Sequence, residues 1–496
     1  MVPDGTYFKT HWLYLWLLVM DATSRLAALV LLSLGATVKA QQLEDTYQAA
    51  AHNDAAYLAE YASYQASVTK EDQAQALWRP TINAQAMNGR TDFSNQIQGA
   101  QFSAPGFPLT NGAGFNTSIV NGSVEQWMVT ATQPLINGAR RAQSQQLSLQ
   151  AEMAEWQWKS AEQKLLQTSA LMYFKATQAA RRVQLLAEQL KAENRIWEET
   201  NEKFRLGYVK NTALLEAESK REWIRAEWLS SQMDLSQQTG ELANITGIPV
   251  EQWQVFSLKD TAIPKLEGTL TEWQQLAESQ NPEMQAQQTA YQIALQGTHA
   301  KEWESSPSLD LVGAYSHDRM SGSGSYGGSS TTMNNGVVGV QLTIPIYSGG
   351  MRSAQHNEQV RLEDQKFNEL VNTRRQIHLA VQQAWMGYWT DIKKITALGL
   401  SVKASTERLA STELGYSIGD KTTLDVLNAQ TDKTQGYSEW LLAREGLIGH
   451  WMDLMALTGM LTPESLSQID QLLDKTPISL GALIQEPEAN SITKGE

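Results

Sequence analysis

The stretch IGDKTTLDVLNAQ, residues 418–430, decides the fold, because the chain carries a counterpart 212 residues earlier, LGYVKNTALLEAE, residues 206–218. In each stretch a glycine, Gly207 or Gly419, follows a long tract without proline and precedes a new helical pattern. Glycine tolerates the left-handed backbone that commonly ends a helix. We therefore expect each half of the chain to hold a long helix that turns back on itself.

The repeat extends well beyond these turns. TQPLINGARRAQ (132–143) matches TIPIYSGGMRSAQ (343–355), and LWRPTINAQA (77–86) matches EWESSPSLDLVGA (302–314). Each half thus runs helix, proline, strand, loop, strand, proline, long helix, turn, helix, which indicates a duplication of one large unit. The expected organisation is a signal peptide at 1–40, a first repeat at 41–247, an inter-repeat linker or equatorial segment at 248–269, a second repeat at 270–461 and a polar, partly disordered tail at 462–496.

The N-terminus predicts export. LAALVLLSLGATVKA, residues 26–40, is an apolar run that follows Arg25 and ends in a small-residue cleavage site after Ala40. It is too short to span a bilayer. Met20 is an alternative translation start, because the longer form places a second apolar patch, HWLYLWLLVM, ahead of the basic residue.

Four segments alternate between apolar and polar residues, near 80–90, 124–134, 308–318 and 336–346. Such alternation is typical of strands in a barrel wall with one face toward lipid and one toward water. Loops rich in Gly, Ser and Asn are expected between them, at 91–122 and 320–336. Small closed barrels need about eight strands, and open sheet edges cannot lie in lipid. Several chains must therefore pool their strands, although the strand count does not fix how many.

The helical tracts are unusually long. Residues 138–204 and 349–416 contain no proline and carry a heptad seam of apolar residues. At 1.5 Å per residue each helix would reach roughly 100 Å. The candidate N-caps of the returning helices are Thr212 in the first repeat and Thr422 or Thr423 in the second. The duplication places both turns on one rim, at the end opposite the strands.

Composition excludes several classes of function. The formal net charge of −14 argues against a nucleic-acid partner. The absence of cysteine excludes disulfides, thiolate metal sites and a lipidated N-terminal cysteine. The seven histidines show no metal-binding spacing, and the Gly/Ser-rich segment at 321–330 lacks the lysine of a phosphate-binding loop. We expect no enzymatic activity, no metal and no cofactor.

Three features of the sequence resemble the TolC family of outer-membrane efflux and secretion channels. They are the two halves of this order, the proline–glycine step after each second strand, and the stretch YSIGDKTTLDVLNAQ at 416–430. The resemblance covers about 43–461. It implies a mainly α fold with a small β part, in which duplicated helical hairpins form an α-helical barrel through the periplasm. It also implies a homotrimer whose four strands per chain build a 12-stranded outer-membrane β-barrel. The implied partners are a periplasmic adaptor protein and an inner-membrane transporter.

The resemblance also implies roles for single residues. Asp425 matches the aspartate that constricts the periplasmic entrance, and Asn428 stands where the best-known member has a second aspartate. Tyr416 and Lys421 match positions whose links to neighbouring helices hold the entrance closed, and Thr212 is a retained bonding partner. From the bare sequence, Asp425 is equally well interpreted as a first-turn aspartate stabilised by the helix dipole.

The first repeat departs from the family pattern at Ala213, where the best-known member offers an aspartate. The helix tips that match the adaptor contacts are Leu206, Gly207, Ile418 and Gly419. Three functions follow: a type I channel for secreted proteins, a channel for drug efflux, or a trimeric coiled-coil surface adhesin. Adhesins of that kind carry their strands once, at the C-terminus, whereas here the strands are internal and duplicated. The absent lipidated cysteine and the LDVLNAQ turn favour secretion over efflux.

Overall fold

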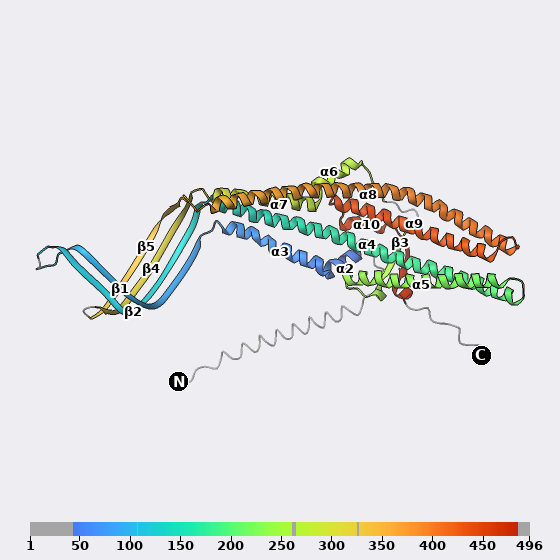
Figure 1. Ribbon diagram of the computed structural model, residues 1–496, viewed down its shortest axis with the longest axis horizontal. Coiled ribbons are helices and arrows are strands. Elements are labelled where there is room, and N and C mark those ends of the chain that lie inside the picture. The colour runs from blue at the N-terminus through green and yellow to red at the C-terminus, as the bar shows by residue number, and fades with distance from the viewer. Residues whose placement is uncertain (1–42, 107, 260–263, 325–326, 485–496) are drawn as a thin grey trace, which may run out of the picture.

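The computed structural model describes residues 43–106, 108–259, 264–324 and 327–484 (Figure 1). The expected signal peptide at 1–40 and the alternative start at Met20 lie outside the described residues. The elements in chain order are α2 (Leu43–Asn53), α3 (Ala55–Ala76), β1 (Thr81–Phe102), β2 (Thr110–Ile136), α4 (Gly138–Arg205), α5 (Asn211–Thr246), η1 (Val250–Gln252), β3 (Gln254–Leu258), α6 (Leu270–Gln280), α7 (Pro282–Trp303), β4 (Ser308–Gly324), β5 (Gly327–Thr343), α8 (Met351–Ser417), α9 (Thr423–Leu457), α10 (Pro463–Asp470), β6 (Leu473–Ser479) and α11 (Leu480–Ile484).

Four strands form one antiparallel sheet in the order β1-β2-β4-β5, at one end of the elongated molecule (Figure 1). The strands are longer than expected, with 22, 27, 17 and 17 residues. The loops expected at 91–122 and 320–336 were wrong, because most of both segments continues the two hairpins. Their Ser, Thr and Asn residues pair across the strands, and such cross-strand pairing overrides a composition typical of loops.

The expected alternation of the strands is confirmed. Cross-strand register places Ala84 opposite Val129, and Leu311 opposite Val340, so these side chains share one face. The residues between them, such as Gln85, belong to the opposite, more polar face. Val338 on the apolar face is 84% exposed. An apolar sheet face that no described element covers is suited to contact lipid.

The two long helices are confirmed. α4 has 68 residues and α8 has 67, so each is about 100 Å long. α5 and α9 fold back along them from the end opposite the sheet (Figure 1). Among the described residues, no helix combines the length and the apolar character needed to cross a bilayer.

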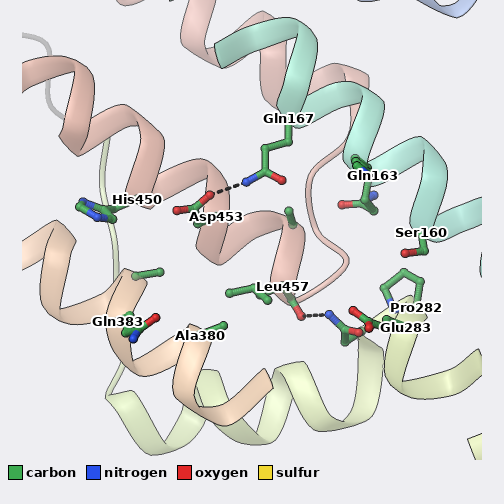
Figure 2. A pocket seen from close by; sticks show the side chains of 14 residues that line it. Ser160, Gln163, Gln167, Pro282, Glu283, Ala380, Gln383, His450, Asp453 and Leu457 are labelled. Carbon is green, nitrogen blue, oxygen red and sulfur yellow. Dashed lines mark hydrogen bonds between the residues drawn. The ribbon is translucent and has the colours of Figure 1, made fainter. Parts of the chain in front are cut away.

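Two asparagines join shorter helices end to end near the middle of the molecule. Asn53 donates from Nδ2 to the carbonyl oxygen of Asn244 near the end of α5 (3.1 Å). Asn281 donates to the carbonyl oxygen of Leu457 at the end of α9 (2.9 Å) and accepts from the backbone N–H of Met284 (2.9 Å). In space, α3 therefore continues the line of α5, and α7 continues the line of α9, so each pair forms one nearly continuous column. The hydrogen bond from Asn281 to Leu457 lies at the edge of a cavity of about 470 Å³ between α4, α7, α8 and α9 (Figure 2).

The C-terminal segment is folded, contrary to the expected polar, partly disordered tail at 462–496. Residues 463–484 form α10, β6 and α11, and residues 485–496 lie outside the described residues. β6 pairs with β3, which comes from the segment between the repeats; Ile478 lies opposite Val255. Leu466 and Leu480 are fully buried. A few well-spaced apolar side chains therefore anchor a segment whose overall composition is polar.

Candidate functional site at the helical tips

The turns that the sequence singled out have the same geometry in both repeats. Gly207 and Gly419 have φ values of 77° and 85°, in the left-handed region. After α8, the backbone N–H of Asp420 donates to the carbonyl oxygen of Gly415 at 2.9 Å, and the corresponding bond after α4 is 2.8 Å. This is the Schellman arrangement that closes a helix C-terminus. The expected duplicated turn is therefore confirmed, and both turns lie at the end away from the sheet (Figure 1).

The outermost side chains of both turns are apolar and exposed. Leu206 is 67% exposed and Ile418 is 75% exposed, and Tyr208 beside them is 78% exposed. These large apolar side chains at the tip are left largely uncovered by the described part of the chain. They form a surface suited to a protein partner.

Asp425 and Thr422 form a capping box at the start of α9. The carboxylate of Asp425 accepts from the backbone N–H and the hydroxyl of Thr422, both at 2.8 Å, and its own N–H donates to the Thr422 hydroxyl at 3.2 Å. These bonds, together with nearby Lys421, hold the pKa of Asp425 below its usual range. Thr422, and not Thr423, is thus the N-cap. The interpretation of Asp425 as a first-turn aspartate is correct for a single chain.

Asp425 and Asn428 lie on one exposed side of α9. They are three residues apart, so their side chains are neighbours on the helix surface. Val426, Leu427 and Ala429 are buried against the rest of the tip. The Asp425 carboxylate, which keeps one oxygen outside the capping box, and the Asn428 amide can therefore face a second chain or a central opening.

Thr212 is not the N-cap that the sequence predicted. α5 begins at Asn211, its N-cap is Lys210, and no side chain caps it. The Thr212 hydroxyl makes no hydrogen bond to any described residue. The difference from Thr422 has a simple cause, because the residue three positions after Thr212 is Leu215 and cannot complete a capping box. Ala213, the next residue, also has no side-chain oxygen that could accept a hydrogen bond.

Tyr416 is tied to the other hairpin by a residue that the sequence did not reveal. Lys203 of α4 donates to the Tyr416 hydroxyl at 3.0 Å, and its ammonium lies 4.5 Å from the centre of the ring. It also donates to Glu199 at 2.7 Å. The bonds to Glu199 and then to Tyr416 raise the pKa of Lys203, so it stays charged. In the sequence, Glu199 and Lys203 look like an ordinary surface pair one helical turn apart, and only the tertiary fold adds Tyr416.

Apolar contacts reinforce this link. Leu409 of α8 packs with Val426 and Ala429 of α9 in a small buried cluster, and Ile196 of α4 and Tyr416 lie against it. The two hairpins of one chain are therefore joined at their tips. Lys421, the other predicted bonding residue, is exposed and lies near Asp425 rather than α4.

The family described as outer membrane efflux protein matches residues 273–460, which is most of the second repeat. The chain is 25% identical over 369 residues to outer membrane protein TolC of Escherichia coli K12, covering 70% of this chain and 73% of TolC. It is 24% identical over 363 residues to the proteases secretion protein PrtF of Dickeya chrysanthemi, covering 71% and 76% of the two chains.

Solved structures show the same fold. The Campylobacter jejuni CmeC outer membrane channel superposes with a TM-score of 0.68 at 16% identity, over 87% of this chain and 90% of CmeC. The outer membrane protein VceC of Vibrio cholerae gives a TM-score of 0.67 at 14% identity, over 84% and 96%. The duplicated hairpins, the four-stranded sheet and these relatives agree. The second repeat belongs to the outer membrane efflux protein family, and the whole chain is an outer-membrane protein similar in sequence and fold to TolC-type channels for efflux or secretion.

Proposed function

We propose that this chain is the subunit of a homotrimeric channel that serves type I protein secretion. The sheet is the observation that supports a trimer, because its edge strands β1 and β5 each have one edge that pairs with no other described strand. Open edges are not stable in lipid. Three copies with four strands each would pair β5 of one chain with β1 of the next and close a 12-stranded barrel.

The helices continue this barrel as a conduit. α3, α4, α7 and α8 run away from the sheet, and α5 and α9 return from the far tips (Figure 1). Three copies of the exposed pair Asp425 and Asn428 would form one acidic ring and one amide ring at the entrance. Like charges on a common axis repel one another, so contacts such as Lys203–Tyr416 would be needed to keep the entrance narrow. No step in this function is enzymatic.

The proposed partners are a periplasmic adaptor protein and an inner-membrane transporter. The exposed apolar tips, with Leu206, Gly207, Ile418 and Gly419, are the surface that would meet the adaptor. Secretion is favoured by the names of two relatives, the proteases secretion protein PrtF and the alkaline protease secretion protein AprF of Pseudomonas aeruginosa, which is 22% identical over 322 residues. These names describe the relatives, and the proposal extends them to this chain.

Multidrug efflux is the second candidate. It is favoured by the outer membrane efflux protein BepC of Brucella suis, which is 27% identical over 194 residues. Family membership leaves the adhesin alternative without support.

Planar-bilayer conductance tests the channel, with wild type compared to Asp425→Ala. We expect a small cation-selective conductance in the wild type that changes in the variant. If membrane-inserted wild type stays silent, opening variants at Tyr416 and Lys421 are tested next, and silence there would contradict the channel.

Deletion of the gene then separates the two cargo classes. Loss of secreted protein from the medium with unchanged drug susceptibility would support secretion. The reverse result would support efflux.

A further inference from the structure

Acidic residues are absent from three of the four places where the chain passes between helix and sheet. Residues 73–91, 126–151 and 319–357 contain no Asp or Glu, although the whole chain has 53 in 496 residues. At that average frequency these segments together would hold about nine acids. The same segments contain six arginines: Arg90 and Arg319 lie within strands β1 and β4, and Arg79, Arg140, Arg141 and Arg352 lie at the passages themselves. A chain with a net charge of −14 is therefore locally basic at this level.

The four arginines lie at one height in the fold. Arg79 is two residues before β1, Arg140 and Arg141 are in the first turn of α4, and Arg352 is in the first turn of α8. The apolar sheet face begins at Ile82, which is 70% exposed. Three residues of extended chain separate Arg79 from Ile82, which is about 10 Å. The guanidinium groups thus belong at the depth where the hydrocarbon of a bilayer gives way to headgroups.

None of the four arginines pairs with a carboxylate among the described residues. Arg140 donates to the carbonyl oxygen of Leu77 at 3.0 Å, and Arg352 donates to the hydroxyl of Ser348 at 2.9 Å. Arg79 reaches only the side-chain amide oxygen of Gln75, at 3.4 Å. A guanidinium has five N–H donors, so each keeps donors to spare and an uncompensated charge.

Arginines farther along the helices are different, because many have an acidic partner. These pairs are Arg182–Glu227, Arg205–Glu202, Arg221–Glu222, Arg225–Glu222, Arg361–Asp364, Arg374–Glu278 and Arg408–Asp432. At the fourth passage, between α7 and β4, acids do occur, and Glu304 there is paired with Lys301 at 2.6 Å. Acidic residues are thus missing from the three passages whose arginines are unpaired. They occur at the fourth passage, where the base Lys301 has an acidic partner.

We propose that Arg79, Arg140, Arg141 and Arg352, the arginine belt, bind the phosphate groups of anionic phospholipids in the leaflet of the outer membrane that faces the periplasm. Arginine matches phosphate geometry by donating two parallel hydrogen bonds. A basic side chain near an anionic membrane surface strengthens binding about fivefold. The proposal rests on the outer-membrane location of the protein, and it requires neither an open pore nor a particular cargo.

Native mass spectrometry of the full-length protein in mixed micelles tests the proposal, with phosphatidylglycerol and phosphatidylcholine as probes. The wild type is expected to retain phosphatidylglycerol at least fivefold more strongly. Arg79→Gln/Arg141→Gln removes the two exposed arginines of the belt and should bring the ratio close to one. Arg225→Gln/Arg361→Gln makes the same change of charge on the helices and should leave the ratio unchanged.

Two further measurements keep the result clear. Arg79→Lys/Arg141→Lys keeps the charge and should retain most of the preference, and helical circular dichroism confirms that each variant is folded. Raising the salt concentration should reduce the wild-type ratio.

Equal ratios in the wild type and the Arg79→Gln/Arg141→Gln variant would overturn the proposal. A wild type without preference would also overturn it, because the belt would then be neutralised inside the assembly.

Discussion

Lys203 and Tyr416 are 213 residues apart in the sequence, yet the ammonium of one lies 3.0 Å from the hydroxyl of the other and joins the tips of the two hairpins. Because α8 carries Tyr416 and α4 carries Lys203, this bond resists separation of the hairpins. One such hydrogen bond contributes about 1 kcal/mol, so its loss should raise the ratio of open to closed entrances about fivefold. Lys203→Met and Tyr416→Phe should both increase single-channel conductance or open time in planar bilayers.

The matched control for this link is Lys210→Met, which removes an exposed lysine from the same tip. It should leave the conductance unchanged. The double variant Lys203→Met/Tyr416→Phe should open no more than either single variant, because both remove the same bond. Additive effects would show that the two residues act separately.

Thr422 and Asp425 allow the capping role to be separated from the pore role. Thr422→Ala removes the cap but keeps the charge, and should lower the stability of the tip by about 1 kcal/mol without changing cation selectivity. Asp425→Asn keeps the shape and removes the charge, and should reduce cation selectivity measured from the reversal potential. Asp432→Asn changes an acid that is already paired with Arg408, farther along α9, and serves as the control. Unchanged selectivity in Asp425→Asn would leave Asp425 with the capping role alone.

The helices could be predicted because their signal is local. The proline-free tracts at 138–204 and 349–416 become α4 and α8 with ends within two residues of those expected. Gly207 and Gly419 end them as the sequence indicated, since the left-handed backbone is a property of one residue.

The other features depend on partners that are distant in the sequence. Residues 91–122 look like a loop until Asn116 is placed opposite Gln96 in the neighbouring strand. The C-terminal segment folds because Leu466 and Ile478 reach a core that other segments provide. Lys203 gained its role only when the fold brought Tyr416 beside it. Local composition cannot reveal any of these contacts.

Glu193 predicts an unusual dependence of stability on pH. It is 1% exposed on α4, and neither carboxyl oxygen has a hydrogen-bond partner among the described residues. Burial raises the pKa of Glu193 to about 7, although Gln189 and Lys220 oppose the shift. The folded protein therefore holds a proton that the unfolded chain releases at lower pH. Stability from this group is complete below the unfolded pKa and is lost as pH rises through about 7.

Glu193→Gln imitates the protonated form and should remove this dependence. We expect it to raise the stability by roughly 3 kcal/mol at pH 8 and by only about 1 kcal/mol at pH 5. Thermal unfolding followed by circular dichroism at both pH values measures the difference. Glu198→Gln, an exposed glutamate on the same helix, should have little effect at either pH. A stabilisation that is the same at pH 5 and pH 8 would mean that Glu193 is ionised, or neutral, throughout this range.

Asn281 offers the sharpest test of how the two halves of each helical column are joined. Its side chain is a donor to Leu457 and an acceptor from Met284, and the residue is 5% exposed. Asn281→Ser keeps an oxygen that can cap α7 but is too short to bond Leu457, whereas Asn281→Ala loses both bonds. Each buried bond contributes about 1 kcal/mol, so alanine should lower the thermal midpoint more than serine. Asn368→Ala, at an exposed position in α8, is the control. Equal losses for serine and alanine would place the whole effect in the bond to α9, and the cap of α7 would then contribute nothing measurable.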